Sequence, residues 1–294
     1  MQIINSPIEK IEFRGCPFLI KRDDLLHTDF SGNKARKFHY FLENNFPNIT
    51  TIISHGSNQS NAMYSLSVLC KIKNWNFIYY THHIPEFLKQ NPNGNYKEAL
   101  QNGMTIKLFE EDKSIEDILY NSSDTIVIKE GGAIQEAQFG IEILANEIKQ
   151  YKELNDIENL KIYLPSGTGT TALFLQKYLD IEVLTNPCVG DSTYLKKQFL
   201  ELEKDETLHP TIIETKKKYH FGKLYKSNYD TYNELLKQTN IEFDLLYDPI
   251  GIETFINYIK EQSNENNTYL YIHQGGIKGN ITMLERYRYK YSKN

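Results

Sequence analysis

The chain is 294 residues long and carries 33 lysine and arginine residues against 38 aspartate and glutamate residues, which gives a formal net charge of −5. Hydrophobic residues make up 40% of the sequence and aromatic residues 13%, so a disordered or fibrous protein is excluded. A chain of this size can bury one large core or two modest ones. Because its positive charge is not clustered, we expect neither a nucleic acid nor a membrane as a partner.

The three cysteines, Cys16, Cys70 and Cys188, are too few and too far apart for a disulfide framework or a zinc site. We therefore predict a reducing compartment and no bound metal. Residues 1–13 lack the basic stretch followed by an apolar stretch that marks an export signal, and no apolar run approaches the roughly 18 residues of a membrane span. These features predict a cytoplasmic protein.

Short runs rich in β-forming residues alternate along the chain with longer helical patterns, which is typical of an α/β fold with parallel sheets. The runs predict strands at residues 49–55, 76–80, 104–109, 125–128, 161–164, 181–185, 244–247 and 269–272. Apolar side chains at helical spacing lie between several of them: Phe38, Phe41 and Leu42; Met63, Leu66, Leu69 and Cys70; Ile141, Ile143, Leu144 and Ile148; Leu173, Leu175, Tyr178 and Leu179. Each group predicts a helix that packs its apolar face on a sheet.

Four of these strands are followed by loops of small and polar residues, at 54–61, 129–133, 165–171 and 273–276. Parallel α/β sheets bind ligands beyond the carboxyl ends of their strands. Glycine and serine let backbone N–H groups approach a ligand closely, and a helix that starts in such a loop adds its positive dipole end. The four loops together predict a site for a small anionic ligand, although glycine and serine are also ordinary turn residues.

The loop at 165–171 has the most explicit sequence, because its glycine- and threonine-rich part lies between a strand and an amphipathic helix. This arrangement predicts a phosphate-binding loop. No lysine follows in the spacing of a nucleotide P-loop, which disfavours a nucleoside triphosphate. Gly167, Gly169 and Ala172 also match the dinucleotide pattern G-x-G-x-x-G/A, but the next strand does not end in the acidic residue that this pattern requires. An NAD(P)-binding protein stays open as an alternative.

A second motif, at residues 31–37, opens a predicted helix with Lys34, Arg36 and Lys37 in its first turn. Lysines are usually exposed, so the plain interpretation is a solvated basic turn. Lysine is also the side chain that forms a Schiff base with an aldehyde, and neighbouring positive charge or desolvation lowers its pKa enough to supply the free amine. A reactive lysine combined with a loop for one phosphate indicates pyridoxal 5′-phosphate as the cofactor.

Seven motifs occur in a characteristic order along the chain: KRDDLL (21–26), SGNKARKFHYFL (31–42), GSNQSN (56–61), KEGG (129–132), SGTGTT (166–171), YDP (247–249) and IHQGG (272–276). This series resembles the 1-aminocyclopropane-1-carboxylate deaminase / D-cysteine desulfhydrase family of pyridoxal-phosphate enzymes. The resemblance implies the tryptophan synthase β-like α/β fold (fold type II), with a small domain at 37–140 inserted into a large domain made of 1–36 and 141–294. It also implies a homodimer and a small amino acid as substrate.

The resemblance further implies a role for single residues of these motifs. Lys34 would form the Schiff base with the cofactor and later move the Cα proton of the substrate. Asn61 would bind the phenolic oxygen of the cofactor, and Ser60, Gln59 and Asn61 would face the substrate, with Ser60 also assisting proton transfer. Ser60 and Asn61 equally suit an ordinary helix N-cap. The phosphate would be bound by the loop residues Gly167, Thr168, Gly169, Thr170 and Thr171.

The sequence departs from this family at two motifs. The family has a tyrosine and then an acidic or hydroxyl residue after its Asp-Pro-Val sequence, whereas here the segment 248–250 is followed by Gly251 and Ile252. Ring opening of aminocyclopropane carboxylate depends on those side chains in the family, so the sequence disfavours that activity unless the neighbouring Tyr247 takes the place of the tyrosine at the substrate. Gln274 stands where the family has threonine, and its amide could donate to the pyridine nitrogen of the cofactor.

The leading hypothesis is therefore a pyridoxal-phosphate lyase similar to D-cysteine desulfhydrase, which eliminates a β-thiol and releases pyruvate, ammonia and sulfide. The alternative within the same family is deamination of 1-aminocyclopropane-1-carboxylate to 2-oxobutyrate and ammonia. Two hypotheses from other classes stay open. One is a catalytically silent homologue that binds the cofactor or only a small amino acid, and the other is an NAD(P)-dependent oxidoreductase.

Overall fold

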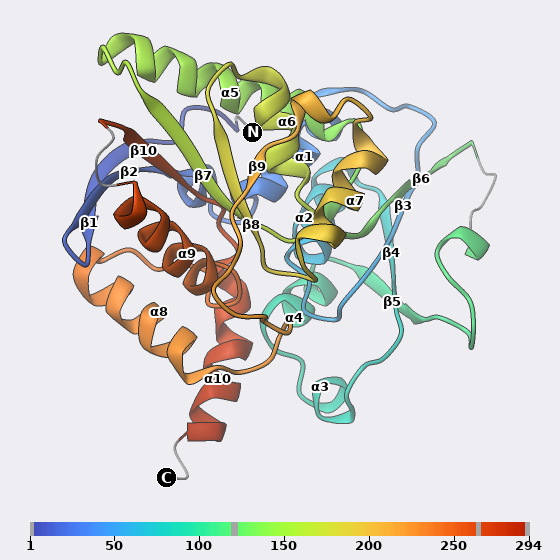
Figure 1. The fold of residues 1–294 in the computed structure, drawn as a ribbon. Coiled ribbons are helices and arrows are strands. Elements are labelled where there is room, and N and C mark those ends of the chain that lie inside the picture. The colour runs from blue at the N-terminus through green and yellow to red at the C-terminus, as the bar shows by residue number, and fades with distance from the viewer. Residues whose placement is uncertain (1–2, 119–122, 263–265, 292–294) are drawn as a thin grey trace.

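The computed structural model describes residues 3–118, 123–262 and 266–291 (Figure 1). Within them the strands form two sheets. The large sheet has the order β1-β2-β10-β7-β8-β9 and consists of β1 (Ile8–Phe13), β2 (Cys16–Arg22), β7 (Leu160–Ser166), β8 (Val183–Pro187), β9 (Thr211–Ile212) and β10 (Thr268–His273). The small sheet has the order β5-β4-β3-β6 and consists of β3 (Thr51–His55), β4 (Asn76–Thr81), β5 (Met104–Leu108) and β6 (Thr125–Ile128).

The helices lie between the strands, as the alternating pattern predicts. They are α1 (Gly32–Glu43), α2 (Asn61–Lys73), α3 (Glu86–Gln90), α4 (Gly94–Gln101), α5 (Ala137–Leu154), α6 (Thr170–Tyr178), α7 (Ser192–Leu202), α8 (Lys226–Thr239), α9 (Asp248–Glu261) and α10 (Asn280–Tyr291). All described neighbours in both sheets pair in parallel except β1 and β2, which form an antiparallel hairpin. The predicted α/β fold with parallel sheets is therefore confirmed.

One predicted strand is wrong and three strands were not predicted. Residues 244–247 form a turn rather than a strand, because the Asp244 carboxylate accepts hydrogen bonds from the backbone N–H groups of Leu246 (2.7 Å) and Tyr247 (2.9 Å), and Pro249 then starts α9. The apolar residues of this segment resemble a buried strand, but their backbone is held by the aspartate. The unpredicted strands are β1, β2 and β9; β1 is only half-buried and β9 has two residues.

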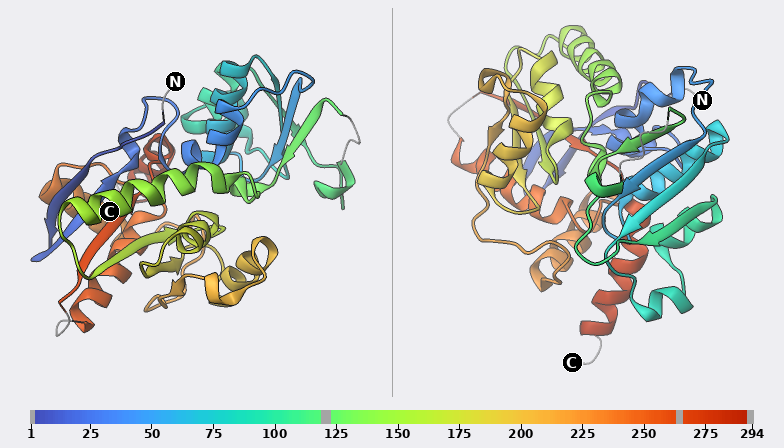
Figure 2. Two further views of the ribbon diagram at one scale, coloured as in Figure 1. Left: turned by 90° about the horizontal axis from the view of Figure 1, so that it is seen from above. Right: turned by 90° about the vertical axis from the view of Figure 1, so that its right-hand side faces the viewer.

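Helices cover both faces of the large sheet (Figures 1 and 2). On one face α5, α6 and α7 pack through apolar side chains such as Ile141, Leu173 and Phe199. On the other face α8 and α9 pack through Leu235 and Phe255. The small sheet has a separate core with α1, α2 and α4, and Figure 2 shows its strands to one side of the large sheet. The domain boundaries at residues 37 and 140 stay a prediction.

A buried ion network holds α1 to the rest of the molecule. The guanidinium of Arg36 is fully buried, and it donates to the carboxylates of Asp23 (2.9 and 3.1 Å) and Glu147 (both 2.8 Å). The Lys21 ammonium also contacts Glu147, at 2.7 Å. Burial alone would raise the pKa of the Asp23 carboxyl, but the charges of Arg36 and Lys21 outweigh it and lower that pKa. The first turn of α1 is thus buried, and its interpretation as a solvated basic turn is wrong.

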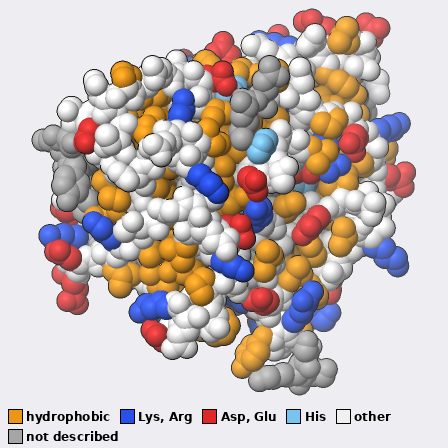
Figure 3. Space-filling model, turned by 180° about the vertical axis from the view of Figure 1, so that it is seen from behind, with side chains coloured by type: hydrophobic (Ala, Val, Ile, Leu, Met, Phe, Trp, Pro, Cys, Tyr) orange, Lys and Arg blue, Asp and Glu red, His pale blue; other side chains and the backbone are white. Residues whose placement is uncertain are grey.

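The molecular surface agrees with the expectation from the net charge. On the face drawn in Figure 3, acidic and basic side chains are interspersed, and positive charge does not gather in one large patch. None of the described helices is long and apolar enough to cross a membrane. Cys16, Cys70 and Cys188 are buried and free of disulfides within the described residues.

Replacing Arg36 with methionine should lower the free energy of unfolding by about 3–5 kcal/mol, because the Asp23 carboxylate would stay buried without its ion-pair partner and Glu147 would keep only Lys21. Urea unfolding followed by circular dichroism measures this change. Lys226→Met, which breaks an exposed pair with Asp230, is the matched control and should change the free energy of unfolding little. A loss below 1 kcal/mol in Arg36→Met would contradict a stabilising role of the network.

Candidate active site

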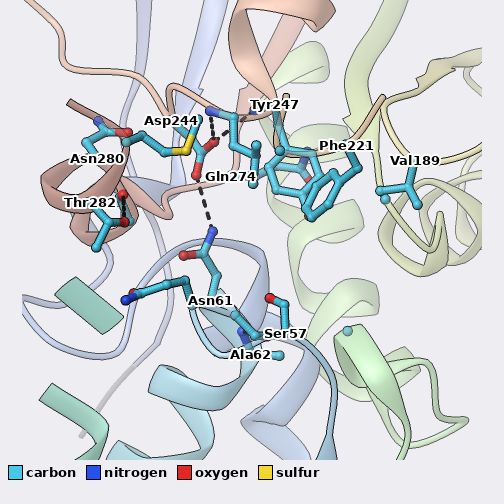
Figure 4. A pocket seen from close by; sticks show the side chains of 18 of the residues that line it. Ser57, Asn61, Ala62, Val189, Phe221, Asp244, Tyr247, Gln274, Asn280 and Thr282 are labelled. Carbon is cyan, nitrogen blue, oxygen red and sulfur yellow. Dashed lines mark hydrogen bonds between the residues drawn. The ribbon is translucent and has the colours of Figure 1, made fainter. Parts of the chain in front are cut away.

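The four predicted loops meet at one cavity between the two sheets. The carboxyl ends of β3 and β6 lie at one edge of the small sheet, and those of β7 and β10 lie at one edge of the large sheet, because both pairs are parallel neighbours. Residues from all four loops, 54–61, 129–133, 165–171 and 273–276, line a cavity of about 1490 Å³. Figure 4 shows side chains from both walls pointing into it. The convergence predicted from the sequence is confirmed.

Lys34 lies in the wall of this cavity, in the first turn of α1. The turn is set by Gly32, whose φ of +65° suits glycine; a Cβ atom there would lie 2.0 Å from the backbone oxygen of Gln274. This close approach lets the N–H group of Asn33 donate to that oxygen (3.0 Å). Burial lowers the pKa of Lys34 to about 8, although the negative charge of Asp244 raises it in part. Lys34 is therefore a partly buried amine, and a fraction of it is unprotonated near neutral pH.

The loop between β7 and α6 has the features of an anion site. Gly169 has a φ of +71°, and a Cβ atom there would lie 2.4 Å from the ring of Phe199. The first N–H groups of α6 have no partner within the helix and face the loop. The Thr171 hydroxyl is buried and has no hydrogen-bond partner among the described residues. Free N–H groups and an unpartnered buried hydroxyl together fit a phosphate group.

The polar residues at the start of α2 mainly bind one another. The Ser60 hydroxyl accepts from the N–H groups of Ala62 (3.1 Å) and Met63 (3.3 Å), so its N-cap role is confirmed. The Gln59 amide donates to the backbone oxygen of Asn93 (3.1 Å) and accepts from the N–H group of Tyr96 (3.3 Å). Both side chains line the cavity, and their roles toward a substrate stay predictions.

Gln274 connects the lysine turn to the phosphate loop. Its Oε1 accepts from Asn33 Nδ2 (2.9 Å), and its Nε2 donates to the backbone oxygen of Pro165 (2.6 Å). Both ends of the amide are thus engaged within the protein. The predicted contact with the pyridine nitrogen of a cofactor stays a prediction.

The structure corrects which residues near the start of α9 face the cavity. Gly251 packs against Pro165 and Tyr271, and Ile252 is fully buried in the core of the large sheet, so neither belongs to the described residues that line the cavity. Tyr247 lies in the cavity wall instead, where a Cβ atom on Gly167 would be 3.4 Å from its hydroxyl. Positions 251 and 252, where the resemblance implies family side chains near the substrate, therefore lie outside the cavity wall in this chain. Because α9 begins at residue 248, these two positions turn toward the sheet.

Three buried charged residues of the cavity wall, Lys37, Asp244 and Asp248, were not predicted as site residues. The Lys37 ammonium is buried and donates to the backbone oxygen of Gly131 (2.9 Å); burial and the charge of Lys34 lower its pKa. The sequence could have indicated this, because a residue three positions after Lys34 in a helix lies on the same helix face as Lys34.

The two aspartates lie in and next to the segment that was predicted as a strand. Burial and the neighbouring Asp248 raise the pKa of Asp244 to about 7. Asp248 accepts from the Tyr271 hydroxyl (2.6 Å) and from the N–H group of Asp244 (2.9 Å). The sequence did hint at a special role for Asp244, because a carboxylate is unusual inside an apolar run. Only the fold shows that this carboxylate faces the cavity.

Among the residues that the structure describes, no group of three or more histidine, cysteine, aspartate or glutamate side chains is arranged to hold a metal ion. The site is built instead from amine, amide, hydroxyl and carboxylate groups on loops at the ends of parallel strands.

No protein-family model matches the chain, and no curated protein matches it. Several solved structures do. An ACC deaminase homologue is 20% identical over 97% of this chain and 94% of its own, with a TM-score of 0.78. A hydrogen sulfide-producing enzyme from Fusobacterium nucleatum is 15% identical over 94% and 97% of the two chains (TM-score 0.67), and O-ureido-L-serine synthase is 14% identical over 94% and 90% (TM-score 0.68). At these identities the likeness concerns the fold, and the predicted tryptophan synthase β-like fold is confirmed.

The lowered pKa of Lys34 predicts its reactivity in the protein without added ligand. Labelling with acetic anhydride at a series of pH values, followed by peptide mass spectrometry, should give a half-maximal rate for Lys34 near pH 8. Lys226, an exposed lysine of α8, is labelled in the same samples as the internal control. A midpoint for Lys34 above pH 10 would show that burial does not lower its pKa.

Proposed function

We propose that this chain is a pyridoxal-phosphate-dependent lyase or deaminase that acts on a small amino acid. The observation that carries the proposal is one cavity that holds both a partly buried lysine with a pKa near 8 and a loop that combines the start of a helix with an unpartnered buried hydroxyl. The first group suits an aldehyde and the second suits a phosphate. The motif resemblance and the shared fold support the same cofactor.

Each part of the cofactor has a residue set that would hold it. Lys34 would bond to the aldehyde carbon, and Asn61 would donate to the phenolic oxygen. The phosphate would be held by backbone N–H groups and hydroxyls of Gly167, Thr168, Gly169, Thr170 and Thr171. Lys37 would lie beside this loop, since Gly131, which accepts its hydrogen bond, packs against Thr168. When bound, the cofactor supplies an electron sink that makes the Cα proton of an amino acid removable.

The protein's own groups would then bind the substrate and move one proton. The positive end of α2, at residues 57–61, suits the substrate carboxylate. The Nζ atom of Lys34, once free, would accept the Cα proton, because a pKa near 8 leaves enough neutral amine at physiological pH and enough basicity for the transfer.

For the specific reaction we propose β-elimination of a thiol from a cysteine-like substrate, with D-cysteine as the first choice. A thiolate is a good leaving group. The reaction therefore needs only one base from the protein, and the Nζ atom of Lys34 can serve as that base. Bond by bond, Lys34 takes the Cα proton and the Cα–H electron pair forms a Cα=Cβ bond. The Cβ–S bond breaks, the sulfur leaves with its electron pair as hydrosulfide, and water converts the remaining enamine to pyruvate and ammonia. A hydrogen sulfide-producing enzyme is among the proteins with this fold.

A second candidate is the ring-opening deamination of 1-aminocyclopropane-1-carboxylate, which Tyr247 favours. This substrate has no leaving group, so its conversion requires a further acidic or nucleophilic side chain near the ring. Tyr247 lies in the cavity wall, and its hydroxyl is an acidic group of this kind. Gly251 and Ile252 have no acidic or nucleophilic side chain. An ACC deaminase homologue is also among the proteins with this fold.

The cofactor is tested by adding pyridoxal phosphate to the purified protein and recording its visible absorbance before and after borohydride reduction. We expect a band that reduction bleaches, with the label on Lys34 in peptide mass spectra. Lys34→Ala should lose both the band and turnover, whereas Lys226→Ala, on the exposed side of α8, should keep them. No band in the unaltered protein, together with protection from proteolysis by NAD(P), would favour the oxidoreductase hypothesis instead.

The reaction is tested by assaying D-cysteine, L-cysteine and 1-aminocyclopropane-1-carboxylate for sulfide, pyruvate and 2-oxobutyrate. Tyr247→Phe should leave thiol elimination within a few fold, but it should slow ring opening by about 10²-fold or more, the range of a lost acid or base. Amino acids that shift the spectrum of the loaded protein while no keto acid forms would identify a catalytically silent homologue.

A further inference from the structure

The side-chain amide of Asn61 is held from both ends. Its Nδ2 donates to Asp244 Oδ2 (3.2 Å), and its Oδ1 accepts from Asn95 Nδ2 (2.7 Å). Asn95 is fully buried and also donates to the backbone oxygen of Gln59 (3.0 Å). The Asn61 amide thus has an acceptor, Asp244, at its nitrogen and a donor, Asn95, at its oxygen. If the amide were flipped by 180°, both hydrogen bonds would be lost, so its orientation is fixed.

The contact between Asn61 and Asp244 crosses the cavity. Asn61 is the first residue of α2, which packs on the small sheet, whereas Asp244 lies in the turn before α9, which packs on the large sheet. Figure 4 shows the two side chains meeting from opposite walls. This hydrogen bond joins the two halves of the site.

The backbone around the pair is shaped to admit it. Gly276 has a φ of +86°, and a Cβ atom there would lie 2.5 Å from Asn61 Nδ2 and 2.6 Å from Asp244 Oδ2. Any larger residue at this position would therefore separate the two groups. The other oxygen of Asp244, Oδ1, accepts hydrogen bonds from the N–H groups of Leu246 and Tyr247 and so stabilises the turn. One carboxylate oxygen therefore binds the backbone and the other binds Asn61.

We propose that Asp244 is a positioning residue that fixes the Asn61 amide with its Nδ2 group on the cavity side, ready to donate its second hydrogen to an acceptor oxygen of a bound ligand. That this oxygen is the phenolic oxygen of pyridoxal phosphate rests on the proposed function. The orientation of the amide does not, because it follows from Asp244, Asn95 and Gly276 alone.

The charge of Asp244 depends on several neighbours. Asp248 repels it, and Lys34 attracts it from α1 across the cavity. The Tyr247 hydroxyl and the Cys188 thiol also face it, and its negative charge raises the pKa of both. Burial and Asp248 together raise the pKa of Asp244 to about 7, so acid should protonate the carboxyl and weaken its hold on Asn61 within an accessible pH range.

The test is NMR of the ligand-free protein labelled with ¹⁵N at asparagine, in which the Asn61 side-chain amide is identified by its loss in Asn61→Ala. In the unaltered protein its resonance should move with a midpoint near pH 7. Asp244→Asn keeps an oxygen for the turn but places an amide opposite Asn61, and it should abolish this titration. Glu242→Gln, the same change two residues away at an exposed carboxylate, should preserve it.

An Asn61 resonance that does not move with pH in the unaltered protein would overturn the inference, whether or not Asp244→Asn folds. The same titration in Asp244→Asn would overturn it as well. A second readout is the affinity for pyridoxal phosphate, which should fall about tenfold in Asp244→Asn and stay unchanged in Glu242→Gln. A protein that never binds pyridoxal phosphate would refute the proposed function, but the NMR titration would still decide the role of Asp244.

Discussion

The buried guanidinium of Arg36 is the contact on which the site depends. It joins the 3₁₀ turn at Asp23–Leu25, helix α1 and helix α5 through Asp23 and Glu147. Without Arg36 the Asp23 carboxylate would stay buried with no ion pair and Glu147 would keep only Lys21, which would be strongly destabilising, so the three elements stay in register. Lys34 lies two residues before Arg36 on the same helix. The Lys34 amine is thereby attached to a rigid part of the molecule, which fixes its place in the cavity wall.

The cavity wall is organised by hydrogen bonds among its own polar side chains. Gln274 ties the lysine turn to the β7–α6 loop, Gln59 ties the start of α2 to the residues before α4, and Ser60 caps α2. These contacts hold the loops before any ligand arrives, so binding would cost little conformational entropy. The Thr171 hydroxyl has no partner among the described residues, the first N–H groups of α6 have none within the helix, and the Lys34 amine donates to the neighbouring Asn33 side chain (3.3 Å). These are the groups with ligand chemistry to offer.

Burial and charge compete at the two titratable groups that face each other across the cavity. Burial favours the neutral forms of both Lys34 and Asp244, while their mutual attraction favours the charged forms. The result is a lysine with a pKa near 8 and an aspartate with a pKa near 7. Both groups can therefore change charge close to neutral pH, as a site that moves protons requires.

The sequence by itself determined the α/β class, all four strands of the small sheet and three of the six strands of the large sheet, the four loops at their carboxyl ends and the lysine among them. These are local properties of periodicity, glycine content and residue type. It did not determine the burial of Arg36 or which residues next to α9 face the cavity, and it did not bring Asp244 to Asn61. Those features depend on where a helix begins and on contacts between residues as far apart as 61 and 244, which only the tertiary structure brings together.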